Sequence, residues 1–214
     1  MKYGTYPGEH VIIPWITDEA FKKAYGPISS RTLLPVTKCY LLYAMARHVL
    51  SLPGQAAECG VYKGGTAYML SSLFSGKKAL YLFDTFAGIP PGDPEKDNRY
   101  IVGGEFADTS LYEVTKLLSG FEGVQFRPGE IPKTFSGIEY EQFSFVHIDL
   151  DIYRPILEAV DFFFPRMARG GLIVFDDYGA EECRGAYIAV EEFCSKIGRP
   201  PIVLPTGQAL IVCY

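Results

Sequence analysis

A histidine and two aspartates stand at the end of an apolar run in the segment FVHIDLDIYRP, at positions 145–155. The apolar run predicts a buried strand, and a buried strand does not hold charged side chains without partners. A second apolar run, GLIVFDD, also ends in two aspartates, Asp176 and Asp177. If these strands are neighbours about 4.8 Å apart, Asp149 faces Asp176. Three carboxylates this close repel one another, so one of them holds a proton or a cation lies between them.

Carboxylate ligands without a cysteine or histidine complement favour a hard cation. The sequence therefore predicts Mg²⁺ at Asp149, Asp176 and Asp177, with Ca²⁺ or Mn²⁺ as possible substitutes. The alternative is that these acids cap helices or lie in solvated turns. Asp151 suits that alternative best, because it directly precedes a helix expected to begin near Tyr153 and could cap it.

His147 and Asp149 also form an H-x-D pair of the kind found in non-haem iron oxygenases. That iron site needs a second histidine, and the other two histidines, His10 and His48, both lie upstream in the chain. We therefore interpret His147 as a packed residue that orients a neighbouring acid.

Strand-like and helix-like segments alternate with short connections after residue 53. Strands are expected in AAECGV, ALYLFD, VQFRP, FSFVHID, GLIVFDD and the closing IVLPTGQALIVCY, and helices in GTAYMLSSLF, LYEVTKLLSG, RPILEAVDFFFPRM and GAYIAVEEFCSKIG. The strands are continuous apolar runs, which predicts a parallel sheet buried on both faces. The closing hairpin would add an antiparallel strand.

Two further segments have a predicted role around this domain of residues 54–214. Residues 1–53 predict a helical extension that serves as a cap, an oligomer contact or part of an acceptor pocket. Its first helix would be capped by Thr17-Asp18-Glu19, and its second would start at Ser29 or Ser30 and be interrupted by Pro35. Residues 85–110 have little regular pattern, and a loop of that length in a compact domain is usually a lid or disordered; we favour a lid over the binding site.

The ends of the predicted strands indicate a nucleoside-containing ligand, since ligands of open parallel sheets bind there. The first strand ends in ECGVYKGGT and the second in Asp84, where an acid can bond ribose hydroxyls. The glycines do not match the dinucleotide pattern G-x-G-x-x-G, and the lysine of a Walker loop is missing. S-adenosylmethionine fits better, because its cationic sulfonium tolerates the acidic mouth made by Glu58, Asp84 and Asp149. If these residues have no binding role, the alternative is that the glycines form a tight turn and that Asp84 is a turn residue at the strand end.

Composition restricts the partners that we expect for the protein and the cellular compartment that we expect it to occupy. The chain has 214 residues, the size of one domain, and a net charge of −5 without a basic run, which argues against a nucleic-acid partner. No signal-peptide pattern and no run of membrane-spanning length is found. The five scattered cysteines include no CxxC pair, so we expect free thiols in the cytoplasm.

Four segments in order, ECGVYKGGT, YLFDTFAGIP, HIDLDIYRPILEAV and GGLIVFDDYG, resemble the macrocin and mycinamicin O-methyltransferase family over roughly residues 55–195. The resemblance implies an α/β, Rossmann-like class I methyltransferase fold. Its sheet would be mostly parallel and seven-stranded, with helices on both faces and a C-terminal antiparallel hairpin. It also implies dependence on Mg²⁺ and S-adenosylmethionine, and methylation of sugar hydroxyls in natural-product biosynthesis.

The resemblance also assigns roles to residues. It places the metal ligands at Asp149, Asp176 and Asp177, and Asp149 would also take the substrate proton. The expected cofactor site comprises Glu58, Gly60, Val61, Tyr62, Gly65, Thr66, Asp84, Thr85, Gly129, Glu130 and Asp149. The chain differs from the antibiotic enzymes in its N-terminal region and in LPTGQALIVCY, so the acceptor stays open between a sugar and another diol-type molecule.

We therefore expect a cytoplasmic, S-adenosylmethionine- and Mg²⁺-dependent O-methyltransferase. It would act on a small-molecule hydroxyl acceptor, without nucleic acid or membrane, as a homo-oligomer of two or more chains. Two alternatives remain. In a metal-independent methyltransferase the acids only bind cofactor, and turnover does not depend on metal. A non-catalytic nucleoside-binding protein would bind the cofactor without turnover.

Overall fold

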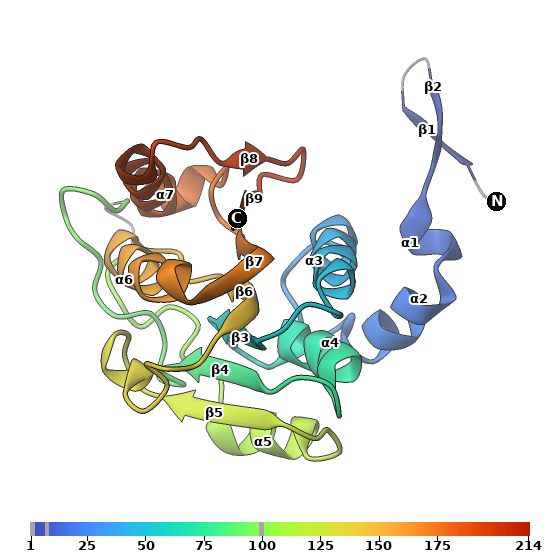
Figure 1. Ribbon diagram of the computed structural model, residues 1–214, viewed down its shortest axis with the longest axis horizontal. Coiled ribbons are helices and arrows are strands. Elements are labelled where there is room, and N and C mark those ends of the chain that lie inside the picture. The colour runs from blue at the N-terminus through green and yellow to red at the C-terminus, as the bar shows by residue number, and fades with distance from the viewer. Residues whose placement is uncertain (1–2, 7–8, 99–100) are drawn as a thin grey trace.

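A seven-stranded sheet between two layers of helices forms the body of the protein (Figure 1). The computed structural model describes residues 3–6, 9–98 and 101–214. The strands of the sheet are β3 (Gln55–Cys59), β4 (Leu80–Asp84), β5 (Val124–Pro128), β6 (Phe143–Ile148), β7 (Met167–Phe175), β8 (Ile202–Val203) and β9 (Ala209–Val212). Their order is β5-β4-β3-β6-β7-β9-β8, in which β3 to β7 run parallel and β9 is antiparallel to both neighbours. The predicted fold class is confirmed.

The helices of this body begin and end close to their predicted bounds. They are α4 (Gly65–Phe74), α5 (Leu111–Leu118), α6 (Tyr153–Phe163) and α7 (Arg184–Ile197), with short 3-10 turns η2 (Lys133–Phe135), η3 (Phe164–Arg166) and η4 (Glu181–Cys183). In Figure 1, α6 and α7 cover one face of the sheet, and α4 covers the other together with α3 (Val36–His48).

The apolar strands divide their side chains between two cores, as a sheet buried on both faces requires. Because successive side chains of a strand point to opposite faces, Phe145 of β6 packs in the core under α3 and α4, whereas Val146 packs under α6 and α7. Every residue of β6 is buried. This strand therefore carries its polar groups into the interior, and they need partners there.

The N-terminal region differs from its prediction in two ways. The longer helix does not start at Ser29 or Ser30, which follow the 3-10 turn η1 (Gly26–Ile28); it starts as α3 directly after Pro35. A residue before proline is driven out of the helical region, so the chain cannot enter the helix earlier. In addition, an unexpected ribbon of β1 (Tyr3–Tyr6) and β2 (Glu9–Ile12) stands away from the body (Figure 1).

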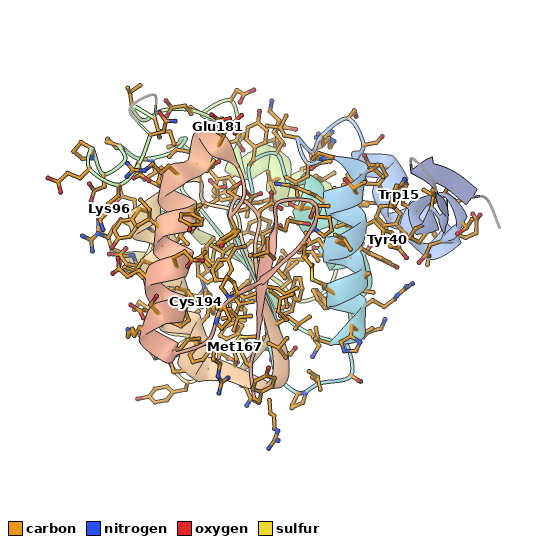
Figure 2. The ribbon with its side chains drawn as sticks, turned by 90° about the horizontal axis from the view of Figure 1, so that it is seen from above. Trp15, Tyr40, Lys96, Met167, Glu181 and Cys194 are labelled. Carbon is orange, nitrogen blue, oxygen red and sulfur yellow. The ribbon has the colours of Figure 1, made fainter. Side chains whose placement is uncertain are left out.

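The remaining N-terminal helices are α1 (Pro14–Thr17) and α2 (Glu19–Tyr25). Asp18 caps α2 by accepting a hydrogen bond from the backbone N–H of Phe21 at 3.0 Å, which confirms the predicted cap. Figure 2 shows Trp15 and Tyr40 side by side at the outer edge of this layer, with ring centroids 6.2 Å apart. Phe21 belongs to the same buried cluster as residues of α4 and β6. The helices before residue 53 thus share a core with the sheet. No helix in the described part of the chain is long and apolar enough to cross a membrane.

The contacts that hold the loop of residues 85–110 include one at its base and one near its middle. At its base, the N–H of Ile89 donates a 2.8 Å hydrogen bond to the carbonyl oxygen of Glu105. The N–H of Gly104 donates another, also of 2.8 Å, to the carbonyl oxygen of Ile89. Near its middle, the buried carboxylate of Asp97 accepts a 2.8 Å hydrogen bond from the backbone N–H of Tyr153, the first residue of α6. Residues 99–100 of this loop lie outside the described residues. The predicted lid is therefore attached to the body through α6.

Candidate active site

A cavity of about 490 Å³ opens at the carboxyl ends of the parallel strands. It lies where the strand order reverses between β3 and β6, which is the usual ligand position in such sheets. Of the predicted site residues, Glu58 alone is missing from its wall. The wall includes Gly60, Val61, Tyr62, Gly65, Thr66, Asp84, Thr85, Gly129, Glu130, Asp149, Asp176 and Asp177. The structure therefore brings the predicted set together around one space.

The glycine loop is shaped by close contacts between backbone segments. Gly60 has φ +93°, and a Cβ atom there would lie 1.7 Å from the carbonyl oxygen of Asp149. A Cβ on Gly65 would lie 2.8 Å from Cβ of Thr32, in the segment that leads to α3. Only glycine permits both approaches. Gly60 thus lets the end of β3 approach the end of β6, and Gly65 lets the start of α4 approach the N-terminal region. Both glycines also line the cavity.

Asp84 fixes the conformation of the glycine loop. Its Oδ2 accepts hydrogen bonds from the backbone N–H groups of Val61 and Tyr62 at 2.7 and 2.8 Å, and its Oδ1 accepts one from Phe86 at 2.6 Å. A carboxylate has about four acceptor positions. If Asp84 binds two ribose hydroxyls as expected, they have to share carboxylate oxygens that already accept hydrogen bonds from backbone N–H groups.

Glu58 lies inside the sheet instead of in the cavity. It is fully buried, and its Oε1 lies 3.0 Å from Nδ1 of His147, whose Nε2 lies 3.6 Å from Oδ1 of Asp176. Burial disfavours the charged ring, but the nearby carboxylates of Asp176 and Glu58 outweigh burial and raise the pKa of His147 to about 9. His147 therefore joins the strand of the glycine loop to the carboxylate cluster.

Both carboxylate oxygens of Asp176 already have a protein partner. Its Oδ2 binds the ammonium of Lys38 at 2.7 Å, and its Oδ1 accepts a 2.8 Å hydrogen bond from Nε2 of Gln208. Burial by itself would raise the pKa of Asp176, but His147 and Lys38 outweigh burial, and the pKa is lowered. No sequence pattern pointed to Lys38, which stands in an otherwise ordinary helical segment of α3 and reaches the site only through the fold.

Asp149 and Asp177 lack comparable neutralisation. One oxygen each from Asp149, Asp176 and Asp177 lies within 4.8 Å of the other two. Burial, followed by the charge of neighbouring aspartates, raises the pKa of Asp149 well above its usual range and that of Asp177 to about 7. Oδ2 of Asp177 is buried without a hydrogen-bond partner in the described residues. This donor set fits a hard divalent cation.

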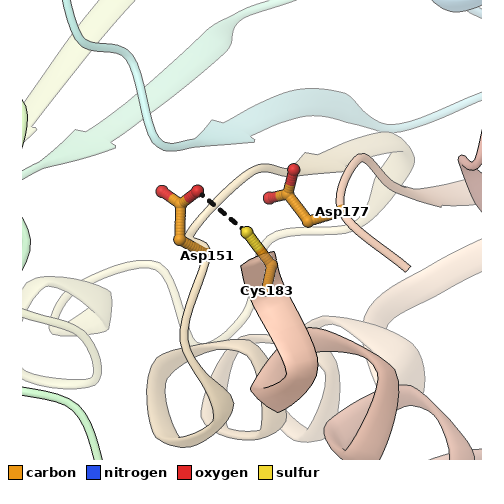
Figure 3. A group of neighbouring side chains, drawn as sticks. All are labelled: Asp151, Asp177 and Cys183. Carbon is orange, nitrogen blue, oxygen red and sulfur yellow. Dashed lines mark hydrogen bonds between the residues drawn. The ribbon is translucent and has the colours of Figure 1, made fainter. Parts of the chain in front are cut away.

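Asp151 does not cap α6. The residue before α6 is Ile152, and the N–H of Tyr153 binds Asp97 instead. Asp151 has φ +62° and accepts a hydrogen bond from the thiol of Cys183 at 3.5 Å (Figure 3). It lines the cavity beside Asp149, so the capping interpretation was wrong for this residue.

Further wall residues were not named by sequence reasoning, although it expected the N-terminal extension and the 85–110 loop to lie near the site. The segment before α3 contributes Arg31 and Thr32, and the start of α6 contributes Arg154. The 85–110 loop contributes Ile89 and Phe106. The loop therefore lines part of the cavity, and its action as a lid stays a prediction.

Comparison with known proteins places this geometry in a family. A model of the macrocin-O-methyltransferase (TylF) family matches residues 27–199. A tetracenomycin 4'-O-methyltransferase from Streptomyces olivaceus, named for its 8-demethyl-8-(2,3-dimethoxy-alpha-L-rhamnosyl) substrate, is 24% identical over 148 residues, which are 63% of this chain and 57% of that protein. Mycinamicin III 3''-O-methyltransferase from Micromonospora griseorubida is 25% identical over 150 residues, 63% of this chain and 59% of that protein.

The match thus spans less than two thirds of the length of these relatives. A solved structure, the O-methyltransferase NovP, superimposes with a TM-score of 0.80 at 17% identity and covers 94% of this chain and 99% of that one. The class I methyltransferase fold extends over nearly the whole chain. Together with the family match, this shows that the chain belongs to the macrocin-O-methyltransferase family.

Proposed function

We propose that this chain transfers the methyl group of S-adenosylmethionine to a hydroxyl of a sugar-type small molecule. Family membership supports O-methyl transfer, and the names of both relatives describe methylation of natural products. The observation that carries the proposal is the cluster of Asp149, Asp176 and Asp177 in the wall of the cavity that the glycine loop also lines.

The chain's own groups provide a site for the cofactor. Asp84 and the backbone of Val61 and Tyr62 form a rigid corner at the ends of β3 and β4. Gly129 and Glu130 lie in the cavity wall next to them, after β5. S-adenosylmethionine bound there supplies an electrophilic methyl group, and the acidic wall favours its cationic sulfonium.

Asp149 is the proposed base. It directly follows β6 at the switch point of the sheet and lies in the cavity wall. Its pKa is raised by burial and by the carboxylate of Asp177, and a more basic carboxylate is a better proton acceptor once it is ionised. General base catalysis of this kind contributes roughly 10²–10⁴-fold to a rate.

A divalent cation held by Asp149, Asp176 and Asp177 would act as a Lewis acid and orient the acceptor hydroxyl. The unpartnered Oδ2 of Asp177 and the raised pKa values of Asp149 and Asp177 support this assignment. We expect the neighbouring Ile89 and Phe106 of the 85–110 loop to exclude water from the bound acceptor.

One observation favours metal-independent transfer as a second candidate. The ammonium of Lys38 already binds Asp176, so part of the charge that calls for a metal is balanced by the protein. In this case Asp149 remains the base, and the acids otherwise serve to bind the cofactor.

The test is transfer from S-adenosylmethionine with a labelled methyl group to a panel of free, nucleotide-linked and glycoside-linked deoxysugars. We expect a labelled product with the purified wild type and none above background with Asp149→Asn. Turnover lost in EDTA and restored by Mg²⁺ supports the metal-dependent form. Turnover unchanged in EDTA supports the second candidate. Binding of S-adenosylhomocysteine without transfer to any acceptor would contradict the assigned acceptor class.

A further inference from the structure

The end of the 85–110 loop contacts Tyr62, a residue of the glycine loop. The hydroxyl of Tyr62 donates a 2.8 Å hydrogen bond to Oδ1 of Asp108. The hydroxyl of Thr109 donates another to the backbone carbonyl oxygen of Tyr62. Since Asp84 accepts a hydrogen bond from the N–H of Tyr62, every polar group of Tyr62 is bound by the end of β4 or by the loop that follows it.

The backbone of Tyr62 is held in a conformation that most side chains disfavour. Its φ is +49°, and Phe106, whose ring centroid lies 5.5 Å from that of Tyr62, has φ +60°. Tyr62, Phe106 and Asp151 are three of the four non-glycine residues with positive φ in the described part of the chain, and all three line the cavity. Such a backbone persists only where neighbouring groups hold it, and it is concentrated at functional sites. The contacts of Tyr62 therefore point to a role in the site.

Asp108 binds two neighbouring side chains of the glycine loop at once. Besides the hydroxyl of Tyr62, its carboxylate binds the ammonium of Lys63, which lies 4.8 Å from the centre of the Tyr62 ring. Hydrogen bonds from Lys63 and Tyr62 lower the pKa of Asp108, so its carboxylate is charged at neutral pH. The side chains of Lys63 and Asp108 are 39% and 67% exposed, and an exposed ion pair contributes little to the stability of a fold. The position that it gives to Tyr62 is the better explanation of this pair.

We infer that Asp108 is a positioning residue of the cofactor site, because it holds Tyr62 in the conformation that binds S-adenosylmethionine. The inference rests on the proposed function, which assigns the cofactor to the glycine loop. Asp84 holds the backbone of this loop, and Asp108 holds its side chains. The 85–110 loop would then complete the cofactor site, besides lining the cavity.

The test measures the affinity of the full chain for S-adenosylhomocysteine by calorimetry and its unfolding free energy by urea titration. Asp108→Ala should weaken the affinity about fivefold, as expected for the loss of hydrogen bonds to a charged group, and should leave the unfolding free energy unchanged. Asp108→Asn keeps an acceptor oxygen for the hydroxyl of Tyr62 and should retain part of the affinity. The matched control is Asp161→Ala, because Asp161 also forms an exposed ion pair, with Lys196, but outside the cavity wall. It should bind and unfold as the wild type does.

A double-mutant cycle shows whether Asp108 acts through Tyr62. Tyr62→Phe keeps the ring and removes the hydroxyl, so it should weaken the affinity by less than Asp108→Ala does. The double variant should bind no more weakly than Asp108→Ala alone, because both changes remove the same contact. Thr109→Val removes the hydroxyl that binds the carbonyl oxygen of Tyr62 and should also weaken binding.

Equal affinity in Asp108→Ala and the wild type, or additive losses in the double variant, would overturn the inference. A lower unfolding free energy with unchanged affinity would also overturn it and make Asp108 a structural residue. Absence of binding by the wild type would contradict the assigned cofactor as well. No measurement here involves an acceptor, so failure of the inference while S-adenosylhomocysteine still binds leaves the proposed methyl transfer standing.

Discussion

The ammonium of Lys38 lies 2.7 Å from Oδ2 of Asp176 and 3.0 Å from its backbone carbonyl oxygen. Lys38 comes from α3 and Asp176 from the end of β7, 138 positions apart in the chain. The close carboxylates predicted a proton or a bound cation between them, and the protein itself supplies one cation. Any metal at Asp176 has to share or displace this ammonium.

We predict that Lys38→Met tightens Mg²⁺ binding at least tenfold. Two unit charges about 5 Å apart interact by about 3 kcal/mol at an effective dielectric constant of 20, so removal of the ammonium favours a divalent cation strongly. The same change removes a positive charge that balances the buried carboxylate of Asp176. The melting temperature in EDTA should therefore fall, and its rise with Mg²⁺ should become larger than in the wild type.

The control for this prediction is Lys196→Met, since Lys196 forms an exposed pair with Asp161 on α7 and α6. It should leave both the melting temperature and its response to Mg²⁺ unchanged. An equal Mg²⁺ response in Lys38→Met and wild type would show that the ammonium does not compete with a metal.

Asp176→Asn and Asp149→Asn should differ in both stability and activity. Asp176→Asn removes the charged partner of Lys38 and His147, so we predict an apo protein that is less stable by about 3 kcal/mol, as for other broken buried pairs. Asp149→Asn removes a repelling charge and should leave the apo protein as stable or more so. Asp149→Asn should nevertheless lower turnover further, because it removes the proposed base together with a ligand.

Melts in EDTA and in millimolar Mg²⁺, together with a turnover assay, measure this difference. Both variants should show a smaller Mg²⁺-induced rise than the wild type, because each loses a ligand and binding to the folded state stabilises by mass action. Full activity of Asp149→Asn would remove it as the base.

The sheet and its helices were predictable because local pattern and tertiary environment agree. The residues of β6 before His147 are apolar except for Ser144, and the structure buries them on both faces. The register then followed from neighbouring strands, since Ile148 lies opposite Phe175, which brings Asp149 beside Asp176. Such elements need only apolar periodicity and strand order.

The partners of the acids were not predictable, because they are set by contacts distant in sequence. Lys38 and Gln208 reach Asp176 from opposite ends of the chain. Glu58 was expected in the cofactor site, but alternation along β3 turns it into the interior toward His147. Capping of α6 was the alternative that suited Asp151 best, but Asp97 from the 85–110 loop takes that position. Sequence spacing locates a side chain on a strand end and does not say which distant group neutralises it.

We predict that Asp84→Ala destabilises the protein even without ligand. The change leaves the N–H groups of Val61, Tyr62 and Phe86 without their acceptor, and each unsatisfied group that stays buried costs about 1–3 kcal/mol. Affinity for S-adenosylhomocysteine should fall as well, because the glycine loop loses its shape. Asp84→Asn, which keeps an acceptor oxygen, should lie between Asp84→Ala and the wild type.

Urea unfolding and calorimetric titration with S-adenosylhomocysteine measure these two effects separately. Asp161→Ala, at an exposed acid of α6, is the control and should behave as the wild type. Reduced affinity with unchanged unfolding free energy would mean that Asp84 acts on the ligand alone.

The attachment of the 85–110 loop to α6 gives the last prediction. Asp97 accepts hydrogen bonds from the N–H groups of Tyr153 and Asp93, and a Cβ on Gly185 would lie 1.6 Å from its Oδ1. Asp97 therefore caps α6 across the fold, and Gly185 of α7 leaves room for its carboxylate. Loss of a cap costs about 1 kcal/mol. We predict that Asp97→Ala lowers stability by this amount and speeds hydrogen exchange of the loop amides near residues 93–98.

Glu95→Ala is the matched control, since Glu95 is an exposed acid in the same loop and its carboxylate forms no hydrogen bond with a described residue. It should exchange as the wild type does. If the loop acts as a lid, S-adenosylhomocysteine together with an acceptor should slow exchange in the wild type, and Asp97→Ala should lose most of that protection. Equal exchange in Asp97→Ala and wild type would show that the base of the loop, at Ile89 and Gly104, holds it without help from α6.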